Sequence, residues 1–119
     1  MAATTDRSAV ITIGGKEYEL VLSTRATKRI TERFDGFDAL GEKLRSEAVT
    51  DQLTDVVWLI VTLVNEGQAR RRFFGEQAED IDEETVLMMT SPADIGDLQS
   101  AITAAIVAGT RREIEPEKN

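Results

Sequence analysis

Carboxylates are the most abundant side chains in this sequence that could do chemistry. The chain holds 22 aspartates and glutamates, but no histidine and no cysteine. These two absences exclude Ser-His and Cys-His nucleophilic systems, histidine general bases, and zinc sites with imidazole or thiolate ligands. Carboxylate pairs, such as Asp35 with Asp38 or Asp94 with Asp97, could still act as they do in glycosidases. Solvated helix ends and caps explain these pairs better, so we expect no catalytic residues and no enzyme.

Two further motifs suggest ligand sites and fail on their spacing. The acidic run Glu79-Asp80-Ile81-Asp82-Glu83-Glu84 begins like a calcium loop. The glycine that such a loop requires is replaced by Thr85, and its closing glutamate by Ser91. Gly14-Gly15-Lys16 lacks the glycine spacing and the Ser or Thr of a phosphate loop, and a strand follows it instead of a helix. We therefore expect neither a metal site nor a cofactor site.

One segment combines cations with aromatic rings: Arg70-Arg71-Arg72 followed by Phe73-Phe74. Charge and stacking of this kind can hold single-stranded nucleic acid, but the net charge of -8 opposes that partner. The favoured interpretation is that the arginines pair with the acidic run that follows and that Phe73 or Phe74 fills the core. A protein-binding patch is the alternative.

Adjacent methionines give a second candidate surface. Met88 and Met89 cannot both point into one core, and thioether side chains adapt to varied partners, so one of them could belong to an interaction surface. Ordinary packing is the favoured interpretation. Trp58, on the most apolar segment, is expected in the core. The candidate protein-binding residues are Arg70, Arg71, Phe73, Phe74, Met88 and Met89.

The elements that must position these residues fit one domain. A chain of 119 residues is the usual size of a single core. We predict a mainly α (α+β) fold, in which a hairpin over residues 9–23 precedes about five helices over residues 24–109. Residues 1–8 are expected to be a flexible N-terminus and residues 111–119 a disordered charged tail, outside a globular domain of residues 9–110.

The alternation of apolar residues and the glycines at 14 and 15 predict the hairpin, with Tyr18 opposite either Ile11 or Ile13. A helix from Thr24 should end at Asp35-Gly36, and a short amphipathic helix should follow. The next helix is apolar nearly all round and must be central.

The remaining helix boundaries are predicted from caps. The central helix should begin at Thr50-Asp51 and close at Asn65-Glu66-Gly67. The acidic residues 76–84 should start another helix, which Val86 to Met89 completes. Ser91-Pro92-Ala93-Asp94 has the pattern of a capping box and should open the last helix, with its C-cap at Gly109. The apolar stripe of that helix could pack internally or against a second copy, so a homo-oligomer is possible.

The polar N-terminal residues lack the apolar stretch of a secretory signal. The run from Val56 to Val64 spans about half of the roughly 20 residues that a membrane helix requires. The lack of cysteine fits a reducing compartment. We expect a cytoplasmic protein without a membrane partner.

The order of these elements resembles tail assembly chaperones of long-tailed bacteriophages. The resemblance rests on Ile13-Gly14-Gly15-Lys16-Glu17-Tyr18-Glu19-Leu20, on the adjacent first helix, on the apolar segment Val56-Val57-Trp58-Leu59-Ile60-Val61, and on the final helix, and it covers about residues 11–109. It implies a protein of the infected bacterial cell that coats the tape-measure protein, helps to recruit tail-tube subunits, and leaves the finished particle. The family supplies no catalytic residues.

Three other classes compete with this one. A structural virion component, such as a head–tail connector or a minor tail protein, would remain in the particle. An acidic mimic of DNA would need its carboxylates in a row on one face, which the intermixed arginines disfavour. An enzyme would need carboxylate, lysine or serine chemistry in a pocket that the sequence does not reveal.

Overall fold

Two antiparallel strands open the fold, which a computed structural model describes for residues 9–46 and 49–110. The strands β1 (Ala9–Ile13) and β2 (Lys16–Leu20) are joined by Gly14 and Gly15, whose φ angles of 61° and 81° suit a tight hairpin turn. Ile11 lies opposite Tyr18, which decides between the two predicted registers. The predictions for residues 1–8 and 111–119 lie outside the described residues.

Two helices follow the hairpin, α1 (Thr24–Phe34) and α2 (Phe37–Ser46). Ser23 is the N-cap of α1, because its hydroxyl accepts a hydrogen bond from the backbone N–H of Ala26 at 3.0 Å. The helix ends where predicted, at Asp35-Gly36. Asp35 itself adopts the left-handed conformation there, with φ 66°, and Gly36 has φ 108°.

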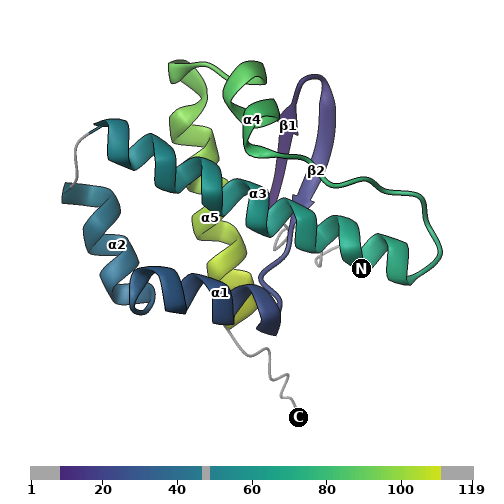
Figure 1. Ribbon diagram of the computed structural model, residues 1–119, viewed down its shortest axis with the longest axis horizontal. Helices are drawn as coiled ribbons and strands as arrows, with labels where there is room; N and C mark the ends of the chain where they lie inside the picture. The colour runs from purple at the N-terminus through teal and green to yellow at the C-terminus, as the bar shows by residue number, and fades with distance from the viewer. Residues whose placement is uncertain (1–8, 47–48, 111–119) are drawn as a thin grey trace, which may run out of the picture.

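The central helix, α3 (Val49–Phe73), is longer than predicted. Thr50 and Asp51 lie within its first turn rather than at its cap. The predicted stop at Asn65-Glu66-Gly67 is wrong, because the helix continues through these residues. Gly67 is helical and allows close packing: a Cβ atom there would lie 2.3 Å from the carbonyl oxygen of Glu19. Figure 1 shows the end of α3 projecting away from the hairpin and the other helices.

The chain then returns along α3 to the helix α4 (Glu83–Met89). Asn65 holds the returning segment, donating to the carbonyl oxygen of Ile81 at 2.9 Å and accepting from its N–H at 2.8 Å. The prediction that the acidic residues 76–84 start this helix is correct only for Glu83 and Glu84, which lie in its first turn, and is wrong for residues 76–82. Residues 76–82 form neither helix nor strand, and Asp82 is the N-cap of α4. Hydrogen bonds from the Thr85 side chain and backbone N–H hold the pKa of Asp82 below its ordinary value.

The last helical region confirms the predicted capping box. A 3₁₀ turn, η2 (Pro92–Asp94), leads into α5 (Ile95–Thr110). The backbone N–H of Ser91 donates to Asp94 Oδ2 at 2.8 Å. Gly109 is not a C-cap, since the helix runs past it. A Cβ atom on Gly109 would lie 2.6 Å from the Leu22 Cβ, so this glycine also permits close packing.

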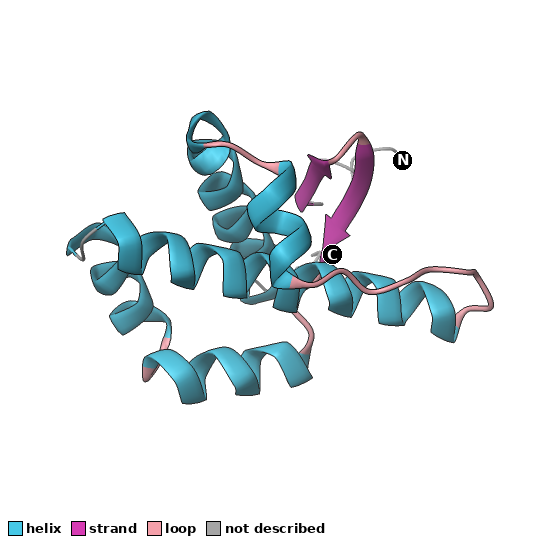
Figure 2. Ribbon diagram, turned by 45° about the horizontal axis from the view of Figure 1, so that its top comes forward, coloured by secondary structure: helices cyan, strands magenta, loops and turns pink. Residues whose placement is uncertain are grey.

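The core lies between the hairpin and the five α-helices, with α2 contributing Leu40. Figure 2 shows the hairpin lying at one side of the helices. The fold class is confirmed: the described chain is a mostly helical globule with an N-terminal hairpin followed by five α-helices. The apolar stripe of α5 packs internally, with Leu98, Ala101, Ile102 and Ala105 buried. No helix among the described residues has the length and apolar character needed to cross a membrane.

Trp58 is half-buried at the edge of this core, so its predicted core position is only partly met. Its ring meets Phe34 edge-on, with 5.9 Å between the ring centroids. The guanidinium carbon of Arg33 lies 4.5 Å from the Trp58 ring centroid, at cation–π distance. Arg33 also pairs with the buried Asp55 at 3.3 Å, which ties α1 to α3.

Candidate protein-binding surfaces

Phe73 and Phe74 lie in solvent at the end of α3. They are 83% and 73% exposed, and their rings meet edge-on with 5.3 Å between centroids. The interpretation that one of them fills the core is therefore wrong. The reason lies in the length of α3, which carries both residues beyond the hairpin that covers its middle. Exposed aromatic side chains in a pair are typical of a binding surface.

A hollow of about 410 Å³ lies beside the two rings. We call it the α3-end surface, lined by Ser23, Arg25, Glu66, Ala69, Arg70, Phe73 and Phe74. Its polar floor is the buried carboxylate of Glu66, whose side chain is only 8% exposed. The surface thus places two aromatic rings next to cationic side chains and a buried acid.

Two hydrogen bonds and an additional ion-pair contact hold Glu66 in place. Arg25 Nε donates at 3.0 Å to Glu66 Oε2 and Arg25 Nη2 lies 2.8 Å from the same oxygen, while the Ser23 hydroxyl donates to Oε1. Burial by itself would raise the pKa of Glu66. The hydrogen bonds from Arg25 and Ser23, with the charges of Arg25 and Arg29, outweigh burial and leave the pKa below its ordinary value. Glu66 therefore links α3 to the start of α1 as an anion.

The arginines of the candidate patch point in different directions. Arg71 Nε lies 3.0 Å from Glu76 Oε1 and Arg72 Nη1 lies 3.0 Å from Asp80 Oδ1, so the predicted pairing with the acidic run is confirmed for these two. Both pairs are partly exposed and contribute little stability. Arg70 instead lines the hollow. Of the basic run, Arg70 is the residue placed beside the aromatic rings.

Met88 and Met89 belong to a different surface. They are 73% and 53% exposed on α4, and with the tip of the hairpin they line a depression of about 520 Å³. We call this the α4–hairpin surface; the other residues lining it are Ile13, Gly14, Lys16, Tyr18, Asp82, Glu84 and Thr85. Five of the six candidate residues therefore divide between two surfaces on separate elements, whereas Arg71 lines neither of these hollows. The favoured interpretation of ordinary core packing is not met, because both methionines are exposed, although Met89 lies close to Gly14 of the hairpin turn.

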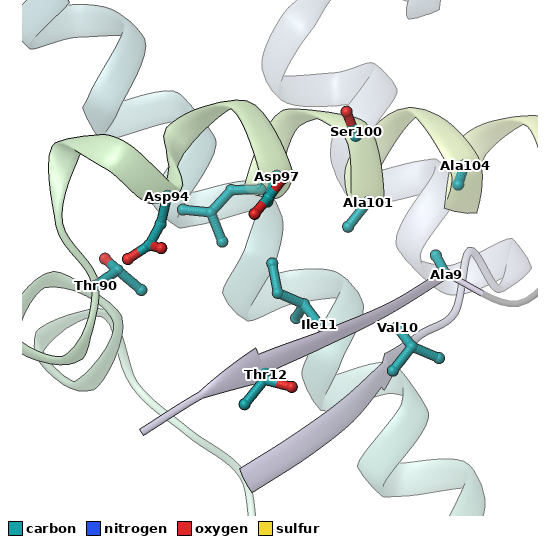
Figure 3. A pocket seen from close by; sticks show the side chains of 11 residues that line it. Ala9, Val10, Ile11, Thr12, Thr90, Asp94, Asp97, Ser100, Ala101 and Ala104 are labelled. Carbon is teal, nitrogen blue, oxygen red and sulfur yellow. The ribbon is translucent and has the colours of Figure 1, made fainter. Parts of the chain in front are cut away.

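Sequence reasoning missed a third depression, a groove of about 570 Å³ between β1 and α5. Figure 3 shows its walls, with Val10 and Thr12 on the strand and Asp97, Ser100 and Ala104 on the helix. The small residues at 100, 101 and 104 were the signal available in the sequence, since a helix face of small side chains leaves room beside a strand.

Three of the acidic candidates, Asp94, Asp80 and Asp82, have structural roles. Asp94 Oδ2 is engaged in the capping box, while Asp80 pairs with Arg72 and Asp82 caps α4. Within residues 9–46 and 49–110, acidic side chains do not gather in any group of three that could hold a metal ion. No protein-family model matches the chain, and neither the curated proteins nor the solved structures include a significant match to it.

Proposed function

We propose that this chain is a tail assembly chaperone of a long-tailed bacteriophage. It binds the tape-measure protein without catalysis and helps to recruit tail-tube subunits in the cytoplasm of the infected cell. The observation that carries the proposal is the exposed ring pair of Phe73 and Phe74 on the α3-end surface. Chaperones of assembly need an apolar surface that is available before the partner arrives, and this pair provides one.

The shape and charge around the rings favour a helical partner. The hollow beside Phe73 and Phe74 can take the apolar face of an amphipathic helix, the kind of segment that a long tape-measure protein presents. Arg70 at its wall can pair with an acidic residue on that helix. The net charge of -8 helps to keep the resulting complex dispersed. The order of hairpin, apolar central helix and final helix supports the same family.

Affinity pull-down with the tagged protein, from cells that express the surrounding gene cluster, tests this function. Mass spectrometry should identify a very long helical tape-measure protein and a tail-tube subunit in the retained fraction. The double variant Phe73→Ser/Phe74→Ser should capture at least tenfold less tape-measure protein than the wild type. The control is Val107→Ser, which removes an exposed apolar side chain from α5 outside both surfaces.

A folded bait that retains neither protein would overturn the proposal. The competing class, a structural virion component, is separated by mass spectrometry of purified particles. A chaperone that leaves the finished particle should be absent from them, whereas a connector or a minor tail protein would be present in a fixed ratio to the tube subunit.

A further inference from the structure

The groove between β1 and α5 has one wall that can form backbone hydrogen bonds. We propose that this groove binds an extended, basic segment of a partner protein, which adds to the hairpin as a third strand next to β1. This site lies on other elements than the α3-end surface, and the proposal does not depend on the function proposed above.

The register of the hairpin shows which peptide groups are available. In a hairpin with a two-residue turn, the residues flanking the turn form a hydrogen-bonded pair, and such pairs then alternate along the strands. Ile13 and Lys16 flank the turn, so Ile11 and Ala9 also direct their N–H and C=O groups toward β2. The peptide groups of Val10 and Thr12 therefore point the other way, toward the groove.

The two outer edges of the hairpin differ. The outer edge of β2 is covered by α3, since the backbone at Gly67 packs against the Glu19 carbonyl and the Val21 N–H donates to the Leu63 carbonyl at 3.1 Å. The outer edge of β1 has no paired strand and no backbone hydrogen bond among the described residues. An open strand edge is a template for strand addition.

The groove runs along this open edge and has room for a backbone. Residues 9–12 of β1 form one wall, and the α5 wall carries Ser100, Ala101 and Ala104, whose short side chains leave the edge accessible. Val10, within β1, is 44% exposed. The five residues of β1 correspond to about 17 Å of extended chain, so a segment of similar length can pair along it.

Charge identifies the chemistry of the occupant. The two charged side chains that line the groove are both acidic, Asp94 and Asp97 (Figure 3). Asp97 forms no ion pair or hydrogen bond with another side chain of residues 9–46 or 49–110. The exposed side chains opposite Val10 and Thr12 on β2 are Glu19 and Glu17. Successive side chains of an added strand point to opposite faces, so Lys or Arg at every second position all lie on one face. On the helix side these cations can meet Asp94 and Asp97, and in the opposite orientation they approach the glutamates of β2.

The test uses the full-length protein, labelled with nitrogen-15, and a capped heptapeptide Thr-Lys-Val-Lys-Val-Lys-Thr as the probe. On titration, the NMR shifts of residues 9–13 and 94–104 should move, and those of the α3-end surface should not. The charge-reversed peptide, with Glu in place of Lys, should bind at least tenfold more weakly. Raised salt should weaken the binding of the basic peptide, because the contacts of its lysines to Asp97 are solvent-exposed.

Val10→Pro removes the outward N–H without removing a bond to β2, since proline is tolerated on an open edge. The Val10→Pro variant should bind the probe at least tenfold more weakly than Val10→Ala, which keeps the N–H. The Asp97→Asn variant should bind the probe about threefold more weakly than the control variant Asp38→Asn, which removes an exposed acid on α2. A probe methylated on every backbone nitrogen should not bind, and this comparison decides the matter even if Val10→Pro does not fold. Shifts that map elsewhere, equal binding of the acidic or methylated peptide, or no binding at millimolar concentration would each overturn the proposal.

Discussion

Gly67 of α3 lies against the backbone of Glu19 in β2, so closely that a Cβ atom at Gly67 would be 2.3 Å from the Glu19 carbonyl oxygen. This contact sets how near the central helix can approach the hairpin. It also covers the outer edge of β2 with a helix and leaves the edge of β1 as the open one.

Gly67→Ala should destabilise the fold by about 1–3 kcal/mol, because the helix and the strand must separate to accept the methyl group. Gly96→Ala is the matched control in α5, where an added Cβ meets no atom within 4 Å. That variant should be neutral or more stable by up to about 1 kcal/mol, since alanine favours the helix. Urea unfolding followed by helical circular dichroism measures both. Equal stability of the two variants would show that the α3–β2 contact can relax at no cost.

The Glu66 carboxylate should make stability depend on pH. Its pKa in the folded protein lies below the ordinary value, so the unfolded chain takes up the proton first as the pH falls. The stabilisation is therefore complete above about pH 4.3 and is lost as the pH falls through the folded-state pKa.

Glu66→Gln should lower stability by about 1 kcal/mol at pH 7, a figure kept small because the partner Arg25 is largely exposed. The difference between the wild type and this variant should shrink toward pH 3. Urea titrations at several pH values measure it, with the exposed Glu79→Gln as the control. A difference that stays constant with pH would contradict the assignment of Glu66 as an anion in the folded state.

Asn65 should control the order of the segment that returns along α3. Its side chain forms two hydrogen bonds with the backbone of Ile81, at 2.9 and 2.8 Å. Asn65→Ala removes both hydrogen bonds and should lower the stability of the returning segment by about 2 kcal/mol. Amide hydrogen exchange of Ile81 should accelerate far more than that of Leu59 in the buried middle of α3. The exposed Gln77→Ala, within the same segment, should leave both rates unchanged; uniform acceleration in Asn65→Ala would instead indicate global destabilisation.

The two exposed phenylalanines should contribute almost nothing to stability. Phe73→Ser/Phe74→Ser should unfold within about 0.5 kcal/mol of the wild type, because both rings are already in solvent. Phe34→Ser, at a buried position, should lose about 3 kcal/mol or more. Thermal or urea unfolding by circular dichroism distinguishes the two cases. A large loss in the double variant would show that the rings pack on the protein in solution.

Local patterns were enough to predict most of the elements. The glycines at 14 and 15 specify the hairpin turn, because only positive φ angles close it. Ser91 and Asp94 specify the start of the last helical region, because both halves of a capping box are written within four residues. The apolar faces at strand and helix spacing predict the buried residues. In each case the residues that specify the structure are close in the sequence to the backbone that adopts it.

The sequence by itself therefore determined the number, type and order of the elements, and it excluded chemistry that requires histidine or cysteine. The tertiary structure decided what Gly67 and Gly109 do, since a glycine that ends a helix and one that lets a helix touch a distant backbone look alike in sequence. It also decided that Phe73 and Phe74 are exposed and that Met88 and Met89 form a separate surface. The tertiary structure likewise decided that the outer edge of β1 is the open one. Exposure and edge pairing depend on which distant segments cover a residue, and no local pattern encodes that.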